Sequence, residues 1–210
     1  MTLKLNGSSS GYTAIDAPAA AGSNTLVLPT GNGSAGQVLK NSSTAGTLEF
    51  GDAGIANIDA WKMTADMSAG DGTIDSNLVR HTTGLTSVPL GTGMSVSSGV
   101  WTFPATGWWR IDANVVAKIP ANTASNYSYL KIQTTPDNST YSTSFEGYGH
   151  SAEINSTHFS GITAVAVLDI TDTSNHKVKF VMEYENNNVQ TAGTSPEAQT
   201  YFIFTRLAGT

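Results

Sequence analysis

The stretch Gly107-Trp108-Trp109-Arg110-Ile111-Asp112-Ala113-Asn114-Val115 decides the fold, because its apolar residues fall on alternate positions. Trp109, Ile111, Ala113 and Val115 share one parity, while charged and amide side chains occupy the other. A period of two is that of a β-strand with one buried face, whereas an amphipathic helix repeats every 3.6 residues. We therefore expect a half-buried strand, in which the rings of Trp108 and Trp109 point to opposite faces and one of them enters the core.

Shorter runs with the same period recur along the chain, at 61–67, 94–96, 127–132, 159–170, 178–184 and 201–204. Segments rich in Gly, Pro, Asn and Asp separate the runs, at 69–72, 89–93, 135–139, 171–175 and 186–188. Short strands with turns at this spacing predict an all-β protein with an antiparallel sandwich or jelly roll. The last run has bulky residues on both parities, so we expect that strand to be buried on both faces, centrally or against a neighbouring chain.

The composition changes near Ile55. All four tryptophans lie after it, whereas Tyr12 and Phe50 are the only aromatic residues before it. The first 54 residues therefore have too little apolar surface to offset the cost of ordering the backbone. We predict an extended, low-complexity arm over residues 1–54 and a β-sandwich head over residues 55–210. Short alternating runs in the arm suggest extended pieces that need partner chains, with anchor candidates Leu3, Leu5, Leu26 and Leu28.

Charge and residue usage exclude several functions. Charged residues make up 12% of the chain, the net charge is −6, and there is no cysteine. An acidic chain does not release counterions from phosphates, so we expect no nucleic-acid partner. The first twenty residues lack the pattern of a secretory signal, and no apolar run reaches 18 residues, so we expect neither export by that route nor membrane insertion. The four histidines are scattered without zinc-binding spacing, and we predict no metal and no cofactor.

Four segments carry a resemblance to a known family. Gly91–Trp109, with Phe103, Pro104 and Gly107 before the deciding strand, resembles the heads of phage fibre proteins, which are similar in turn to complement globular-head and tumour-necrosis-factor jelly rolls. Thr200–Leu207 resembles the last strand of that fold, and Trp61–Ala65 its first. The stretch from Leu3 to Pro29 resembles the low-complexity shafts of phage tail fibres. The resemblance implies a homotrimer located in the virion, anchored by its arm to another tail or capsid protein, with the head facing outward.

Two groups of head residues are candidates for contacts. Core or trimer-interface candidates are the large aromatic residues Trp61, Trp101, Trp108, Trp109, Tyr201, Phe202 and Phe204. Polar loops with amides and tyrosines suit adaptable recognition, so the candidates for binding a host-surface glycan or envelope protein are Asn122, Asn126, Tyr127, Asn138, Tyr141 and Asn187. Solvated loop tips and ordinary core packing remain open as the alternatives for each.

Catalysis is not expected. The chain has no Gly-x-Ser-x-Gly elbow, and aspartates in Asn- and Gly-bearing segments usually form turns. The favoured function is attachment of a phage particle to its host. A capsid decoration or tail-assembly adaptor without a receptor role is the first alternative. A glycan depolymerase, with a carboxylate pair drawn from Glu146, Glu153, Asp169 and Asp172, is the second.

Overall fold

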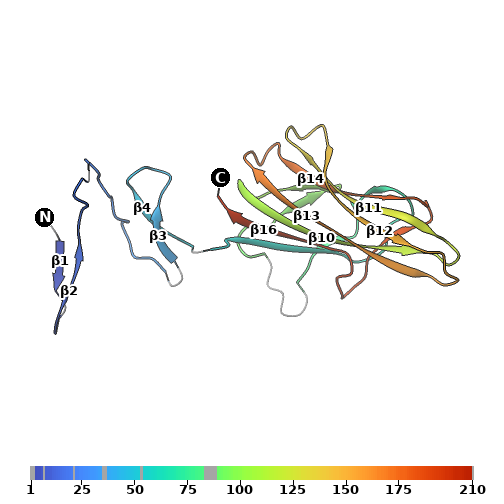
Figure 1. Cartoon of the computed structure of the whole chain (residues 1–210), viewed down its shortest axis with the longest axis horizontal. Coiled ribbons are helices and arrows are strands. Elements are labelled where there is room, and N and C mark those ends of the chain that lie inside the picture. The colour runs from blue at the N-terminus through green and yellow to red at the C-terminus, as the bar shows by residue number, and fades with distance from the viewer. Residues whose placement is uncertain are drawn as a thin grey trace. The chain divides into compact units, whose positions relative to one another are not determined.

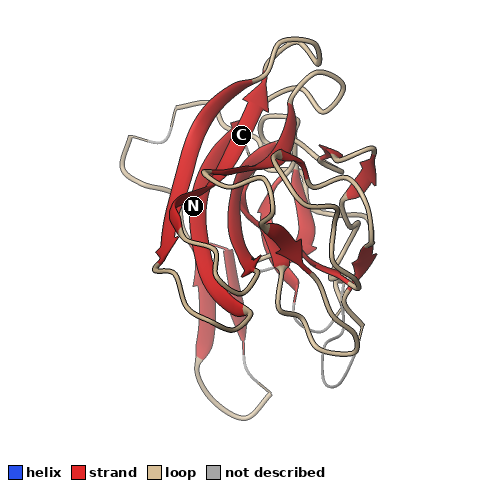
Figure 2. Ribbon diagram, turned by 90° about the vertical axis from the view of Figure 1, so that its right-hand side faces the viewer, coloured by secondary structure: helices blue, strands red, loops and turns tan. Residues whose placement is uncertain are grey.

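The computed structural model describes residues 3–6, 8–20, 22–34, 37–52, 54–82 and 89–209, and within them it contains strands and no helix (Figure 2). No described helix is therefore long and apolar enough to cross a membrane. The chain divides into two compact units, Met1–Ala53 and Gly54–Thr210, which correspond to the arm and the head. Each is described by itself.

The arm consists of two separate hairpins (Figure 1). In the first, β1 (Leu3–Asn6) pairs with β2 (Tyr12–Ile15); in the second, β3 (Gln37–Asn41) pairs with β4 (Leu48–Asp52). Leu26 and Leu28 flank a single parallel bridge between Val27 and Thr47, so this predicted run is extended but is not a strand of its own. The second hairpin was not predicted, because its residues show little alternation of large apolar side chains.

The head is a sandwich of two six-stranded sheets. Sheet I has the order β13-β10-β16-β5-β7, and β15 also pairs with β10; sheet II has the order β12-β11-β14-β9-β8, and β6 also pairs with β14. The strands of sheet I are β5 (Asn57–Met63), β7 (Leu78–Arg80), β10 (Gly107–Ile119), β13 (His158–Ile170), β15 (Gln190–Ala192) and β16 (Tyr201–Ala208). Those of sheet II are β6 (Gly72–Thr73), β8 (Ser95–Ser97), β9 (Val100–Thr102), β11 (Ser125–Thr135), β12 (Ser142–Ser151) and β14 (Lys177–Tyr184).

This strand order confirms the predicted antiparallel jelly roll. The chain crosses from one sheet to the other at nearly every long connection, so that β9 lies in sheet II, β10 in sheet I and β11 in sheet II again. Such crossings wrap the chain around one shared core between two sheets. The last strand, predicted to be buried on both faces, lies between β10 and β5, but its outward residues Tyr201 and Ile203 are only half-buried.

The stretch Gly107–Val115, in β10, has one buried face, as its period of two predicts. Inward residues of β10 are fully buried from Trp109 to Ile119, and the outward residues between them are not. At Gly107 the backbone φ is +135°, and a Cβ there would overlap the carbonyl oxygen of Ala208. Only glycine meets both conditions, so this residue sets where β10 begins.

The centre of the core is aromatic and joins the two sheets. Trp101 on β9 of sheet II is fully buried, and its ring lies 4.9 Å from that of Phe204 and 5.7 Å from that of Phe202, both on β16 of sheet I. The Phe180 ring on β14 stacks on Phe202 at 4.2 Å. Aromatic pairs at these separations contribute beyond the area they bury, so this cluster holds the sheets together.

A buried carboxylate closes one end of the sandwich. Asp59 on β5 accepts two hydrogen bonds from the Arg80 guanidinium, at 2.8 and 3.0 Å, and one from the indole N–H of Trp61 at 2.8 Å. The backbone N–H of Met94 donates to the same carboxylate at 2.8 Å. The hydrogen bond to Asp59 raises the pKa of Arg80 above its usual value.

The strand predicted from the run at 61–67 ends earlier than expected. The alternation at 61–67 suggested a single strand, but β5 ends at Met63. Beyond it the chain turns away because the side-chain amide of Asn77 donates to the carbonyls of Ala65 and Asp66, at 3.3 and 3.1 Å. Met67 then donates its backbone N–H to Thr191 instead of continuing the sheet.

Candidate functional site

The predicted receptor-binding residues lie at two ends of the head. Asn122, with φ of +58°, precedes β11, and Asn138, with φ of +56°, follows it. A strand rises about 3.3 Å per residue, so the length of β11 separates these two asparagines by roughly 30 Å. Asn187 lies in the turn after β14, at the Asn122 end, and Tyr141 lies before β12, at the Asn138 end. The six candidates therefore do not form one site.

Two of the candidates are not in a loop. Asn126 and Tyr127 belong to β11, where a register shift between Ser125 and Ser128 carries Tyr127 onto the outer face of sheet II. The pattern of amides around them was typical of a loop, but a bulge of this kind lets a polar segment remain in the ladder. Tyr141, at the other end, packs under the ammonium group of Lys179, which lies 3.9 Å from the ring centre.

The predicted core and interface residues divide by face. Trp101, Trp109, Phe202 and Phe204 are fully buried in the core, and Trp61 packs against it. Trp108 and Tyr201 lie on the outer face of sheet I, where Trp108 is 45% exposed and Tyr201 is half-buried. Trp108 and Tyr201 therefore remain available for contact with another molecule.

The outer face of sheet I is largely apolar near β13. Its exposed large side chains are Trp108, Phe159, Val165, Val167 and Leu207. A hollow of about 150 Å³ lies beside them, lined by Val165, Thr163 and Tyr201 among others. Arg110 pairs with Asp112 at 2.6 Å and Lys118 with Asp66 at 2.6 Å, while the carboxylate of Asp169, opposite Trp108 in the β10–β13 ladder, is exposed. The face offers apolar contact and little free charge.

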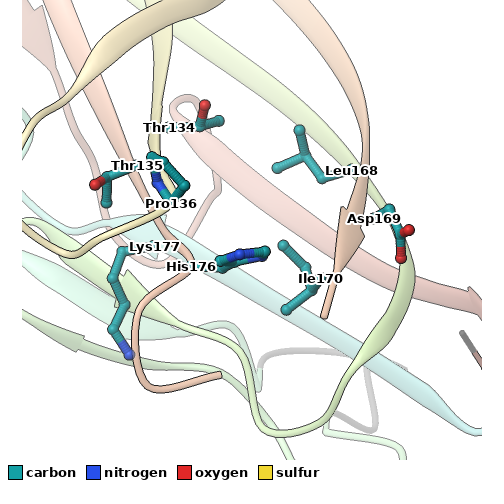
Figure 3. Close-up of a pocket in the computed structure, with 8 residues that line it drawn as sticks. All are labelled: Thr134, Thr135, Pro136, Leu168, Asp169, Ile170, His176 and Lys177. Carbon is teal, nitrogen blue, oxygen red and sulfur yellow. The ribbon is translucent and has the colours of Figure 1, made fainter. Parts of the chain in front are cut away.

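A cavity of about 290 Å³ opens at the Asn138 end of the sandwich (Figure 3). Its lining residues are Thr134, Thr135, Pro136, Leu168, Asp169, Ile170, His176 and Lys177. Most of its polar groups are already bonded within the protein. Lys177 donates to the carbonyl of Thr173 at 2.6 Å, and the His176 Nδ1 atom accepts from the backbone N–H of Thr171 at 3.3 Å. The cavity therefore has few groups left with which to recognise a ligand.

Of the carboxylates considered for catalysis, Asp172 has a structural role in a turn. Asp172 accepts from the backbone N–H of Ser174 and from the side chain of Asn175, and these bonds lower the pKa of Asp172. Asp137 accepts from the backbone N–H groups of Ser139 and Thr140, and its pKa is likewise lowered, chiefly by the bond from Thr140. These are turn-forming aspartates, as the sequence suggests. Across the described part of the chain, no cluster of three potential metal ligands occurs.

The outer face of sheet II carries a row of aromatic side chains at the Asn122 end, which we call the aromatic row: Tyr127, Tyr129, Tyr148 and His150. Tyr129 on β11 lies directly opposite Tyr148 on β12, with ring centres 5.5 Å apart. Tyr127 lies 5.3 Å from Tyr129, and His150 lies 6.3 Å from Tyr148 in a stacked arrangement. Cross-strand pairing therefore brings residues from two separate runs into one surface.

Sequence reasoning identified only Tyr127 of this row as a site residue. The segment 145–151 contains two glycines and two large aromatic residues, but the alignment of β12 on β11 cannot be read from either strand alone. Gly147 and Gly149 explain why β12 lies where it does. A Cβ at position 147 would overlap the carbonyl oxygen of Thr163, and one at 149 would lie 2.6 Å from Ile162 Cγ1, so both glycines permit close packing against β13.

The comparisons with known proteins extend only to folds. No protein-family model matches the chain, and no curated protein matches its sequence. Solved structures that resemble it include murine APRIL at pH 8.5, with a TM-score of 0.49 and 10% identity over 72% of this chain and 98% of that chain. The TNF protein Eiger from S. frugiperda has a TM-score of 0.48 and 10% identity, over 75% of this chain and 96% of that chain. The jelly-roll assignment rests on the strand order itself.

Proposed function

We propose that this chain is a structural protein of a phage particle, a tail fibre or spike, that forms a homotrimer, attaches by residues 1–54 and recognises a host surface with its head without catalysis. The resemblance of Gly91–Trp109 and of the arm to phage fibre proteins supports the class of protein. The observation that carries the proposal is the apolar outer face of sheet I, which a single chain leaves in water.

The chemistry of that face suits a second copy of the same chain. Phe159, Val165 and Val167 are 57%, 49% and 45% exposed on one edge strand. Burying such surface contributes about 25 cal/mol per Å², and monomeric proteins seldom expose large contiguous patches of this kind. Arg110 and Lys118 are paired within the chain, which limits the charge repulsion between two copies of the face. The three-fold arrangement comes from the resemblance.

The arm also favours assembly with other chains. Leu3, Leu5, Tyr12 and Ile15 on the first hairpin are all more than half exposed. A two-stranded hairpin with no apolar layer against it is marginal in water. Partner arms, or another tail or capsid protein, would supply that layer.

Analytical ultracentrifugation of the full chain at low micromolar concentration tests the assembly. We expect a mass of three chains for the wild-type protein and of one chain for the double variant Val165→Lys/Val167→Lys, with the far-ultraviolet spectrum unchanged. Gln133→Lys, on the outer face of sheet II, is the matched control and should remain trimeric. A stable single-chain mass for the wild-type protein would contradict the proposal.

Cryo-electron microscopy of the particle that carries the protein tests its role. We expect three heads at the distal end of a fibre or spike, with the arms toward the particle. Heads packed on capsomers or enclosed in the tail would instead establish a capsid decoration or an assembly adaptor. Release of reducing ends from host polysaccharide by the purified protein would establish the depolymerase alternative and remove the non-enzymatic role.

A further inference from the structure

The two outer faces of the head differ, and sheet II has exposed side chains that are rigid and amphipathic. Tyr148 is 57% exposed, yet its hydroxyl donates to the backbone carbonyl of Asn126 at 2.6 Å. That bond fixes the ring across β11 and leaves part of its surface in solvent. A side chain held in this way loses little conformational freedom when a ligand binds, which favours affinity.

Neighbouring polar groups hold the row in place. The side-chain amide of Asn126 donates to Glu185 Oε1 at 2.8 Å, and its backbone N–H donates to Oε2 of the same carboxylate. These bonds lower the pKa of Glu185. Lys131 pairs with Glu183 on β14, and the ammonium group lies 5.7 Å from the centre of the Tyr129 ring. The aromatic row is therefore bordered by a fixed set of charged and amide groups.

We propose that the aromatic row, Tyr127, Tyr129, Tyr148 and His150, is a binding platform for a neutral glycan chain. The aliphatic C–H groups on one face of a pyranose ring are weakly positive, and the face of an aromatic ring is negative, so the two attract. Successive rings are 5.3, 5.5 and 6.3 Å apart, a spacing on the scale of one sugar unit. An open row can therefore contact several consecutive sugars.

The polar border selects the ligand further. Glu183 lies opposite Tyr129 in the β11–β14 ladder, and Glu146 lies opposite Lys131 in the β11–β12 ladder. Together with Glu185, they place three carboxylates against one adjacent cation, Lys131. Carboxylates accept hydrogen bonds from sugar hydroxyls, and their excess negative charge disfavours sialylated, sulfated or phosphorylated chains. The surface thus fits a neutral polymer rich in hydroxyl groups.

A proline-rich peptide is the competing occupant, since it also stacks on tyrosines. Such peptides dock in aromatic-lined grooves, whereas the two head cavities described above are lined by other residues. The bordering carboxylates, which can accept hydrogen bonds from sugar hydroxyls, favour the glycan. The identification of the ligand deepens the proposed function and rests on the head being the exposed, recognising part of the chain.

Saturation-transfer NMR and a glycan array with the full chain test the platform. The probes are neutral oligosaccharides built from glucose, galactose or N-acetylglucosamine, their sialylated and sulfated counterparts, and a proline-rich decapeptide. We expect binding to one or more neutral members. Tyr148→Ala and Tyr129→Ala should each raise the dissociation constant about tenfold or more, the scale of one lost aromatic contact. Gln133→Ala shortens an outward side chain of β11 outside the aromatic row and should leave binding unchanged.

Other outcomes overturn the proposal in distinguishable ways. Binding to no neutral glycan, binding only to anionic glycans or to the peptide, or equal binding by the wild-type protein and Tyr148→Ala would each contradict the platform. Tyr148→Phe retains the ring but not the bond to Asn126, so an intermediate loss supports the role of the fixed geometry. None of these readouts needs a virus particle. Neutral-glycan binding by a protein that proves to lie inside a capsid would refute the proposed function and leave the platform intact.

Discussion

The two outer faces of the head are built on the same plan and differ in what they present to solvent. In β10, β11 and β14, alternate residues enter the shared core, so the two sheets meet through similar apolar side chains. Outward positions of β13 in sheet I carry Val165 and Val167, whereas those of β11 and β12 carry Tyr129 and Tyr148. The comparison shows that the buried residues specify the fold, whereas the outward residues determine what chemistry each face presents to solvent.

Substitution at the shared core should affect both faces together and have the largest effect. Trp101→Ala removes a fully buried ring that touches aromatic residues of both sheets, so we expect a loss of about 3–5 kcal/mol in the free energy of unfolding. Denaturant titration followed by tryptophan fluorescence and circular dichroism measures this loss. If trimer formation or ligand binding failed without any loss of stability, the core and the faces would not be separable as described.

Asp59→Ala tests a buried polar contact that joins β5 and β7 of sheet I to the segment before β8. The change leaves Arg80 without its carboxylate and frees the N–H groups of Trp61 and Met94. Breaking such a pair costs about 3 kcal/mol, because one charge stays without its partner in a half-buried setting. Asp59→Asn keeps the shape and should recover part of the loss. Equal stability of the wild-type protein and Asp59→Ala in thermal melts would contradict the structural role of this network.

Gly147→Ala tests whether the edge of sheet II must lie so close to β13. The added methyl group would overlap the backbone of Thr163, so β12 would have to move, at a cost of about 1–3 kcal/mol. Because Tyr148 is the next residue, we also expect weaker glycan binding. Gly161→Ala on β13, where a Cβ meets nothing within 4 Å, is the matched control for stability. A larger loss from the control would count against the close approach.

Substitutions at outward positions should change the property of one face without changing that of the other, and with little loss of stability. Val167→Ser on sheet I and Tyr148→Ser on sheet II each change an exposed side chain, for which effects on stability are usually within about 0.5 kcal/mol. We expect the first to weaken the trimer and leave glycan binding intact, and the second to do the reverse. Ultracentrifugation and saturation-transfer NMR on the same two samples measure both. Loss of both trimer formation and glycan binding in one variant would contradict the assignment of separate roles to the two faces.

The smallest expected effect is the change in stability that acid causes through Glu185, beside the aromatic row. The bonds from Asn126 hold the pKa of Glu185 below its usual value in the folded state. This stabilisation is present above the unfolded pKa, near 4.3, and disappears as the pH falls through the lower folded value. Thermal melts between pH 7 and pH 3 should therefore show slightly less acid sensitivity in Glu185→Gln than in the wild-type protein. Greater acid sensitivity in the variant would contradict the predicted loss of stabilisation by Glu185 as the pH falls.

Alternation with a period of two predicted which residues of a strand face the core. It could not predict which residues of two strands lie opposite each other. The run at Trp109 to Val115 predicted β10 and its buried face, and opposite faces for Trp108 and Trp109 are what the structure has. The aromatic row was missed because Tyr129 and Tyr148 meet only through the register of β11 on β12. Register depends on the turn between them and on the glycines that dock β12, which involve contacts between residues distant in sequence.

The alternation of inward and outward positions also bears on how the protein can evolve. Along β11, buried Leu130 and Ile132 alternate with half-exposed Tyr129 and Lys131. Single mutations at the outward positions change the outer surface of sheet II while the hydrophobic neighbours keep the strand in place. Outward substitutions on β11 can therefore accumulate one residue at a time without altering the residues that build the core.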